Sequence, residues 1–493
     1  MLLALWQRSP LQRAPGLVLV SALLVHVVGT ASSLAGAADS PGDATPASFL
    51  EKAPRAGKAS ERDGLDLRER FTVYSRTSNV VVFVLDAVPS DFFAELLEDE
   101  SFAERVPPGF TYFRNAVSMY PGTIFSLQSI LTSRAIGNGM KRRRWEVRQM
   151  RQSVPTRLAA RGYVASLLTN TPFHLTCDRG TFGYACQSHA AFLPHLAASL
   201  TSEAADWDLE DDLRTVWNVT FFRLVPHLVK PWVYNGGSWR LPVVRPPGLE
   251  AGSDPEVWFR SQRDLALMHG LIREASTREM PPTFKLIHLF GAHHPSSLDR
   301  DCSWNGRKNT ARSAKLGAVR ASSIGVDAAG CSLSLVFELL AKLDALGVYD
   351  DSLVFVVADH GRPATPIDLR LAERPPIDPR WLPPDTPDPT TAVPDSHQRV
   401  PLFLVKRPSA RHPLAFSDVP VSLCDVPHSI FGELGLTAKF DCESIFEIAD
   451  HRRTPRYFYK DRGDSRKGRR RHWFDRIAIE THSWFASSWQ PAP

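Results

Sequence analysis

The sequence predicts an α/β fold, a three-layer α/β/α sandwich around a mostly parallel central sheet. Short, uninterrupted apolar runs recur along the chain, and segments with apolar residues at helical spacing lie between them. This alternation is typical of a parallel sheet that helices cover on both faces. The 493 residues are 43% hydrophobic, which is enough for one large domain or two ordinary ones. The 39 prolines indicate long ordered loops around a compact centre rather than a helical bundle.

The apolar runs are the expected strands. They do not alternate between apolar and polar residues, which indicates that both of their faces are buried. In chain order they are 79–85 ("NVVVFVL"), 163–169 ("YVASLLT"), 284–290 ("FKLIHLF"), 353–358 ("LVFVVA") and 401–405 ("PLFLV"). The clearest crossover helices are expected at 254–276 and 330–352, and a shorter helix at 153–162 precedes the second strand.

The N-terminus has the composition of an export signal. Arg8 and Arg13 precede an apolar run from Gly16 to Ala31, and the small residues at 35–37 fit a cleavage site. We therefore expect residues 1–37 to be a signal peptide. An uncleaved membrane anchor is the alternative, since the run is slightly short for a full span. The protein is expected to be exported to the periplasm or cell envelope, and anchored to the membrane if the segment is retained.

The remaining chain divides by composition. Residues 38–70 are rich in Ala, Ser, Gly, Pro and charge and are expected to be a linker. Residues 71–453 hold all of the expected strands, and residues 454–493 form a basic and aromatic C-terminal extension. Its run "RKGRRRHWF" (466–474) could bind anionic lipid headgroups or glycans, or could be a solvated tail.

The cysteines indicate disulfides. No C-x-x-C pair is present, which argues against a zinc knuckle or a thioredoxin-like motif. Disulfides are the natural use of cysteines in an oxidising compartment. The local pairs are Cys177 with Cys186 and Cys424 with Cys442, which leaves Cys302 with Cys331. The sequence alone leaves this pairing open.

Polar side chains follow three of the expected strands. Asp86 comes directly after the first strand, His293 follows the third, and Asp359 and His360 follow the fourth. The carboxyl ends of parallel strands meet at one edge of a sheet, where open α/β folds bind ligands, so we expect these groups to converge. Carboxylates with an imidazole suit a divalent metal such as zinc or manganese. A single strand that simply ends in a polar turn is the alternative for any one of them.

A candidate nucleophile lies in "YPGTIFSLQSILTSR" (120–134), where Thr123 comes just before a helix-like segment. Backbone N–H groups at a helix N-terminus attract anions. Contact with a metal would lower the pKa of the hydroxyl enough to make it a nucleophile near neutral pH. The alternative for Thr123 is an ordinary N-cap residue.

Five motifs together resemble a known family. They are "LDAVPSDFF", "PGTIFSLQSILTSR", "HLFGAHHP", "VVADHG" and "SHQRVPLFLV", in that order along the chain. This set is similar to the sulfatase-like branch of the alkaline phosphatase superfamily, with phosphoethanolamine transferases and lipoteichoic acid synthases as the nearest members. The resemblance covers about residues 77–450, so 71–453 is the expected catalytic domain.

The resemblance implies a set of site residues. Asp86, Thr123, Asp359 and His360 would bind one divalent metal, with zinc expected and manganese as the alternative. Thr123 would also carry a covalent phosphoryl intermediate. His293 and His397 would contact the transferred group or protonate the leaving oxygen, or could instead hold a second metal. His288 is interpreted as a packed core histidine.

The expected function is that of an exported, metal-dependent hydrolase or transferase acting on phosphate esters. A sulfuric ester hydrolase is the first alternative, although sulfatases modify a Cys or Ser in C/S-x-P-x-R. Only "SVPTR" (153–157) matches that pattern, and it lies before the second strand. The helix-like "SLQSILTS" that should follow the nucleophile instead follows Thr123. A catalytically silent binding protein on the same fold is the second alternative.

The expected partner is an anionic phosphate- or sulfate-ester substrate, such as a lipid headgroup or a glycan. The net charge of +5 suits such a substrate or an anionic membrane surface, and it does not single out nucleic acid. The chain has at most one candidate membrane segment, fewer than the lipid synthases carry.

Overall fold

The structure, a computed structural model, describes residues 65–66, 68–140, 142–169, 184–188, 225–226, 230, 255–293, 298–303, 318–361, 399–448, 452, 454–461, 472–480, 482–483 and 488–492. The predicted signal or anchor at 1–37 and nearly all of the predicted linker at 38–70 lie outside these residues. Within the described part of the chain, no helix is long and apolar enough to cross a membrane.

A mostly parallel sheet forms the centre of the fold, as predicted. In the described residues it has eight strands in the order β11-β3-β10-β9-β2-β8-β5-β6. Strands β9, β2, β8, β5 and β6 run parallel, whereas β10 is antiparallel to both of its neighbours. The strand bounds are β2 Asn79–Leu85, β3 Phe110–Phe113, β5 Val164–Thr169, β6 Ala185–Ser188, β8 Thr283–Leu289, β9 Ser352–Ala358, β10 Phe403–Lys406 and β11 Ala415–Ser417.

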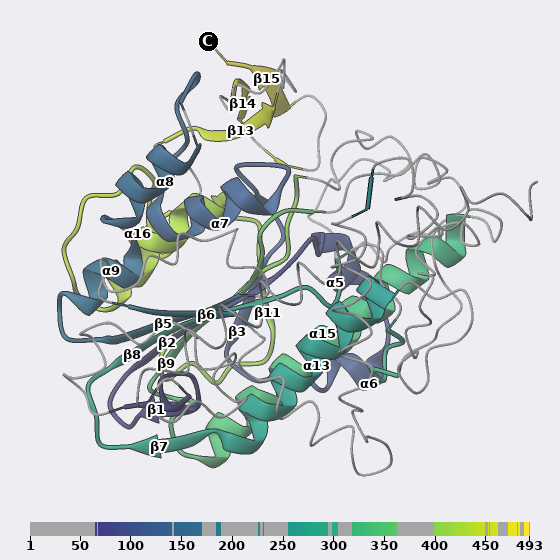
Figure 1. Cartoon of the computed structure of the whole chain (residues 1–493), viewed down its shortest axis with the longest axis vertical. Coiled ribbons are helices and arrows are strands. Elements are labelled where there is room, and N and C mark those ends of the chain that lie inside the picture. The colour runs from purple at the N-terminus through teal and green to yellow at the C-terminus, as the bar shows by residue number, and fades with distance from the viewer. Residues whose placement is uncertain are drawn as a thin grey trace, which may run out of the picture. The chain divides into compact units, whose positions relative to one another are not determined.

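Helices cover both faces of the sheet, which confirms the three-layer prediction (Figure 1). Alternate side chains of β2 enter two different cores, Val81, Phe83 and Leu85 one of them and Val80, Val82 and Val84 the other, as the two-residue period of a strand requires. The first core is completed by α5 (Ser90–Leu96), α13 (Pro255–Glu274) and α15 (Ala318–Ala345), and the second by α7 (Thr123–Thr132), α8 (Arg142–Met150), α9 (Val154–Ala159) and α16 (Val426–Glu433).

The register of the central strands aligns their carboxyl ends. Leu85, the last residue of β2, pairs with Ala358 at the end of β9 and with Leu289 at the end of β8. The residues that follow these three strands therefore leave the sheet at the same level. This alignment is what the convergence predicted from the sequence requires.

Shorter elements complete the described fold. Three small sheets accompany the central one: β1 with β7, β12 with β4, and the antiparallel set β13-β14-β15. The bounds are α4 Glu69–Thr72, β1 Val73–Ser75, α6 Glu100–Ala103, β4 Ala116–Val117, β7 Ser276–Arg278, β12 Val421–Ser422, the 3-10 helix η9 Leu423–Asp425, β13 Arg456–Asp461, β14 Phe474–Ile479 and β15 Trp489–Pro491. The sheet β13–β15 comes from the C-terminal extension, for which the sequence predicted no folded structure.

Two of the expected disulfides are present. Cys302 pairs with Cys331, and Cys424 pairs with Cys442. The expected pairing of Cys177 with Cys186 involves a residue, Cys177, outside the described part of the chain.

A buried lysine lies in the first core. Lys285 on β8 is only 1% exposed, and its Nζ donates a hydrogen bond of 2.5 Å to the carbonyl oxygen of Arg70. The ammonium also lies 4.8 Å from the centre of the Tyr74 ring. Burial, reinforced by the positive charge of Arg70, lowers the pKa of Lys285 to about 7. The folded protein therefore favours the neutral amine more strongly than the unfolded chain does.

Replacing Lys285 by Met should make the unfolding free energy less dependent on pH. Because the pKa of Lys285 is about 7 when folded and 10.5 ordinarily, the unfolded chain binds more protons between these values. The stability of the wild type should thus rise with pH across that window, with a slope from Lys285 of at most about 1.4 kcal/mol per pH unit. Urea denaturation of wild type and Lys285→Met at several pH values measures the difference.

The exposed Lys439 supplies the control for this comparison. Lys439→Met should show the same pH dependence as the wild type. Equal slopes in all three proteins would show that Lys285 is charged in the folded state over the whole range.

Candidate active site

Those predicted site residues that the structure describes lie close together. Asp86 and Asp359 leave the ends of the paired strands β2 and β9, and both are fully buried. The Nε2 of His360 lies 3.3 Å from Asp359 Oδ2 and 3.7 Å from Asp86 Oδ1. The Nε2 of His293 lies 3.9 Å from Asp86 Oδ1. Its side chain is 34% exposed, whereas that of His360 is 5% exposed, so His293 lies toward the solvent side of the cluster.

Thr123 brings a hydroxyl into the same cluster. Its Oγ1 donates to Asp86 Oδ2 at 3.1 Å and lies 3.3 Å from His360 Nε2. Thr123 is the first residue of α7, and the N-cap is Gly122. The alternative interpretation of Thr123 as an N-cap residue is therefore wrong. The hydroxyl faces the acids instead of the helix backbone, and the N-terminus of α7 adds a positive partial charge beside it.

Local backbone structure orients the Asp359 carboxylate. Asp359 Oδ1 accepts hydrogen bonds from the N–H groups of Ala87 at 3.0 Å and of His360 at 2.9 Å. Ala87 has a φ of 57°, in the left-handed region that non-glycine residues rarely adopt. Such strain is typical of functional sites, where the surrounding structure maintains it. The turn after β2 therefore gives up some local stability and directs its N–H group at Asp359.

The hydrogen bonding of His360 indicates its tautomer. Its Nδ1 lies 2.5 Å from the carbonyl oxygen of Gly361, which can only accept a hydrogen bond. Nδ1 therefore carries the proton, and in the neutral ring the lone pair of Nε2 faces Asp86 and Thr123. This arrangement, with one ring nitrogen held by a carbonyl group, is typical of metal-binding histidines.

The charges in the cluster perturb one another. Burial raises the pKa of Asp86, but the hydrogen bond from His288 and the charges of His293 and His360 outweigh it and hold that pKa well below its usual range. Burial and the negative charge of Asp86 raise the pKa of Asp359. For His360, burial lowers the pKa, but the two carboxylates raise it more, so the net shift is upward. The cluster thus favours positive charge between its acids.

The donor set fits a divalent cation. Among the described residues, Asp86 Oδ1 and Asp359 Oδ2 accept no hydrogen bond although both are buried. A buried carboxylate oxygen without a donor is costly, and a bound cation would offset that cost. Carboxylate oxygens with an imidazole nitrogen suit zinc or manganese.

His288 takes part in the cluster, which sequence reasoning did not predict. It is fully buried, as expected for a core histidine, but its Nε2 lies 3.4 Å from Asp86 Oδ2. Asp86, His288 and Asp359 each offer a ligand atom within 4.8 Å of the others. The strand period carries the signal. His288 pairs with Val84, and Asp86 follows Val84 by one strand period, so the two side chains share a face.

Asp264 is a second residue that the sequence analysis missed. It is a buried acid on α13, and its Oδ2 accepts a hydrogen bond from the N–H of Phe290. The carbonyl oxygen of Phe290 in turn accepts from the N–H of His293 at 2.8 Å. Asp264 therefore holds the turn that carries His293. An acid within the apolar face of a predicted helix was the available signal.

Two further predictions concern His397 and the segment that matches the sulfatase pattern. His397 lies outside the described residues, so its predicted role stays a prediction. Ser153, in the segment that matches the sulfatase pattern, is the N-cap of α9. Its hydroxyl donates to the Met150 carbonyl oxygen at 2.8 Å and lies 3.0 Å from the hydroxyl of Thr156.

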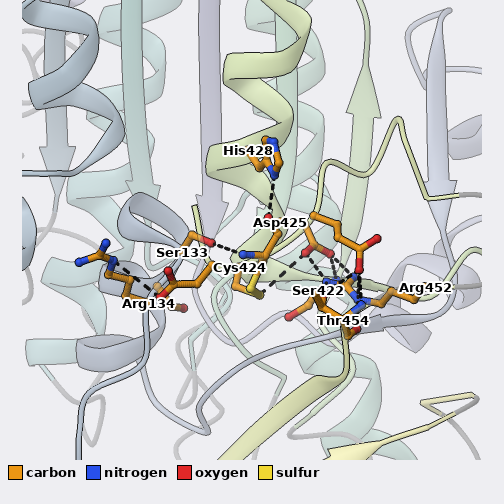
Figure 2. Close-up of a disulfide and its surroundings, with 12 residues drawn as sticks. Ser133, Arg134, Ser422, Cys424, Asp425, His428, Arg452 and Thr454 are labelled. Carbon is orange, nitrogen blue, oxygen red and sulfur yellow. Dashed lines mark hydrogen bonds and ion pairs between the residues drawn. A yellow bond between two sulfur atoms is a disulfide. The ribbon is translucent and has the colours of Figure 1, made fainter. Parts of the chain in front are cut away.

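The C-terminal end of α7 is also fixed (Figure 2). Ser133 ends the helix with a φ of 60°, and its Oγ accepts a hydrogen bond of 3.0 Å from the N–H of Cys442. Cys442 is joined by its disulfide to Cys424 in η9. Beside this disulfide, the carboxylate of Asp425 is paired with the guanidinium of Arg452. The helix that begins at Thr123 is thereby attached to the cross-linked segment.

A sequence model described as Sulfatase matches residues 78–436, which confirms the resemblance seen in the motifs. No curated protein sequence is similar enough to this chain to be identified as a relative.

Solved structures match this chain at low sequence identity, among them the following three. The phosphonate monoester hydrolase SpPMH from Silicibacter pomeroyi is 16% identical, with a TM-score of 0.45 over 79% of this chain and 81% of that one. The C-terminal periplasmic domain of EcEptC from Escherichia coli, in complex with Zn, is 13% identical, with a TM-score of 0.40 over 84% and 92%. BT4656 in complex with D-glucosamine-2-N,6-O-disulfate is 9% identical, with a TM-score of 0.40 over 82% and 88%.

Asp359→Asn should weaken zinc binding by the purified protein by at least about 100-fold, because even supporting residues around a metal contribute about 10- to 100-fold. The amide keeps the size of the side chain and removes the charge between Asp86 and His360. Isothermal titration of the metal-stripped protein with zinc measures the affinity. Asp441→Asn, an exposed acid with a side chain 55% accessible, should bind zinc like the wild type. Equal affinities for all three proteins would place the metal elsewhere.

Proposed function

The chain belongs to the sulfatase family, and we propose that it is a metal-dependent enzyme that hydrolyses or transfers a phosphate ester through Thr123. One observation carries the proposal. The Thr123 hydroxyl contacts both Asp86 and His360, at 3.1 Å and 3.3 Å, inside an otherwise buried cluster of acids and imidazoles. A buried hydroxyl beside ionised groups at a helix N-terminus has the surroundings of an activated nucleophile.

The proposed metal ligands are Asp86, Thr123, Asp359 and His360. Zinc is the first choice and manganese the second, since both accept mixed oxygen and nitrogen ligands. A bound cation would favour the ionised hydroxyl and neutralise charge on the oxygens of the ester. His288 contacts Asp86 from the buried side and would orient that carboxylate.

The attack on phosphorus requires Thr123 to lose its proton. Thr123 Oγ1 donates its hydrogen bond to Asp86 Oδ2, and a cation held by these ligands would favour loss of that proton to solvent, so that Oγ1 can attack phosphorus. The bond from phosphorus to the leaving oxygen breaks, and His293 is exposed enough to donate a proton to that oxygen. Water or an acceptor hydroxyl then attacks the phosphothreonine, and Thr123 regains its proton. Water as the acceptor makes the enzyme a hydrolase, and a glycan or lipid hydroxyl makes it a transferase.

The environment of Ser153 favours Thr123 over a sulfatase mechanism. A sulfatase would need the residue at this pattern to be converted and to face the metal ligands. The Ser153 hydroxyl is buried at the start of α9 and bonds to Met150, whereas the Thr123 hydroxyl bonds to Asp86. Sulfate-ester cleavage is therefore the competing outcome of the experiment below.

We further propose that the protein is exported to the periplasm or cell envelope. The disulfides Cys302–Cys331 and Cys424–Cys442 support an oxidising compartment. The substrate would be an anionic ester, with a lipid headgroup or a glycan as the two sources that this compartment offers.

Thr123→Ala should lower kcat/KM on bis(para-nitrophenyl) phosphate by at least about 1,000-fold, because removing a nucleophile abolishes the covalent step. Thr123→Ser should retain measurable turnover. Mass spectrometry of wild type quenched during turnover should find a peptide containing Thr123 that carries a para-nitrophenyl-phosphoryl group, since attack on the diester expels only one nitrophenolate. Turnover of para-nitrophenyl sulfate that survives Thr123→Ala would favour the sulfatase alternative.

The matched control is Thr132→Ala on the same helix. Thr132 is also buried, but its hydroxyl donates to the Gln128 carbonyl oxygen inside α7. Its replacement should leave kcat/KM within about threefold of the wild type, since loss of one internal hydrogen bond costs about 1 kcal/mol of stability and no catalytic group. A wild type that binds no metal and cleaves neither ester would favour the silent binding protein.

A further inference from the structure

We infer that the C-terminal sheet β13–β15 positions the nucleophile by holding Tyr120 through Tyr459 and Phe474. This inference rests on the proposed role of Thr123. The sheet comes from the extension after the family-matched segment, yet it packs against the residues that lead directly into α7. Tyr120, Phe474 and Trp145 belong to one buried cluster, with Tyr459 packed against it.

Tyr120 is enclosed by aromatic rings. It is fully buried, and its ring is stacked on that of Tyr459 with centroids 5.2 Å apart and planes at 25°. The ring of Phe474 meets it edge-on at 5.3 Å, and Phe125 lies at 5.4 Å. Aromatic pairs at these separations add stability beyond the area that they bury. Tyr459 and Phe474 lie on the paired strands β13 and β14.

Hydrogen bonds fix the same segment in position. The N–H of Tyr459 donates to the Met119 carbonyl oxygen at 2.8 Å. The Tyr120 hydroxyl accepts from the N–H of Ile136 at 2.8 Å, and its carbonyl oxygen accepts from Ser126 Oγ at 3.0 Å. Tyr120 is thus bonded at its backbone and at its ring to residues that follow Thr123, while the preceding Met119 is bonded to β13.

The C-terminal sheet also holds Ser118, through Arg399. The N–H of Ser118 donates to the Arg399 carbonyl oxygen at 2.9 Å. The guanidinium of Arg399 lies over the ring of Phe458 on β13 at 5.1 Å and over the ring of Trp489 on β15 at 4.7 Å. Two cation–π contacts to buried or partly buried rings anchor Arg399 to the sheet.

A second set of contacts ties β14 to the chain beyond α7. The N–H of Phe474 donates to Asn138 Oδ1 at 2.7 Å, and Asn138 Nδ2 donates back to the Phe474 carbonyl oxygen at 3.3 Å. The N–H of Gly139 donates to the His472 carbonyl oxygen at 2.9 Å. The sheet is therefore bonded to residues on both sides of the helix that begins at Thr123 (Figure 1).

Little chain separates the anchor from the nucleophile. Only Pro121 and Gly122 lie between Tyr120 and Thr123, so a shift of the tyrosine is expected to displace the start of α7, where the hydroxyl lies. The Thr123–Asp86 hydrogen bond of 3.1 Å leaves little room for such a shift. A misplacement of about 1 Å in an active site can cost about 100-fold in rate. Tyr459 and Phe474 are therefore positioning residues for Thr123.

The test compares Tyr459→Ala, Tyr459→Phe and the control Tyr457→Ala. Tyr457 lies on the same strand. Its ring packs on the guanidinium of Arg476 and lies 6.4 Å from the ring of Tyr459, but it is not part of the buried cluster around Tyr120. Tyr459→Ala should lower kcat on bis(para-nitrophenyl) phosphate about 10- to 100-fold with KM within about threefold, because geometry is lost but binding is not. Tyr459→Phe keeps the stacked ring and should restore kcat. Tyr457→Ala should stay within about twofold of the wild type.

Hydrogen–deuterium exchange of the same proteins separates positioning from the reaction. Peptides covering 118–126 should exchange faster in Tyr459→Ala alone, whether or not the enzyme turns over the ester. Unchanged exchange of these peptides in Tyr459→Ala would overturn the inference. So would a kcat of Tyr459→Phe as low as that of Tyr459→Ala. A wild type without esterase activity would sink the proposed function and leave the exchange result decisive. If Tyr459→Ala does not fold, the milder Phe474→Leu takes its place in both measurements.

Discussion

Two fully buried carboxylates at the ends of paired parallel strands are the constraint on which the site depends. Asp86 and Asp359 sit side by side because Leu85 pairs with Ala358. Ionised groups in such a position are costly unless positive charge or hydrogen-bond donors surround them. The imidazoles of His288 and His360 meet this need from the protein side, and a cation would complete it. The Thr123 hydroxyl lies where that positive charge is required.

The sheet buries the two carboxylates, and the same burial strengthens the interactions that stabilise them. Central strands buried on both faces exclude water from the ends of β2 and β9, which strengthens every electrostatic interaction between the groups there. The strained Ala87 turn directs its N–H group at Asp359, and Asp264 holds the turn that carries His293. Both contacts act on a turn just beyond a strand end, the first after β2 and the second after β8. The apolar strands are therefore the rigid part of the site, and the turns after them carry Asp86, His293, Asp359 and His360, four of the residues proposed to act in catalysis.

The features predicted correctly from the sequence are those that local pattern determines. The apolar strands can be predicted from their composition. Asp86 and Asp359 are the residues that directly follow β2 and β9. β3 and β11 were not predicted, because Phe110–Phe113 and Ala415–Ser417 are too short to show a period. His288 was read as core alone, since its contact with Asp86 depends on strand register. Contacts of this kind join residues far apart in sequence and leave no local signal.

The C-terminal extension shows the same limit most clearly. Its basic and aromatic composition suggested a surface segment, yet the rings of Phe458, Tyr459 and Phe474 pack against other residues of the fold. The matched family segment, residues 78–436, ends before β13 begins at Arg456. The groups proposed to react thus lie within the family segment, whereas β13–β15, which we infer to position Thr123, lies outside it. Because α7 is also tied at Ser133 to the Cys424–Cys442 segment, Thr123 begins a helix that is restrained at both ends. A nucleophile that must stay within hydrogen-bond reach of two buried groups gains from such restraint, since the entropy of holding it is lost on folding instead of during the reaction.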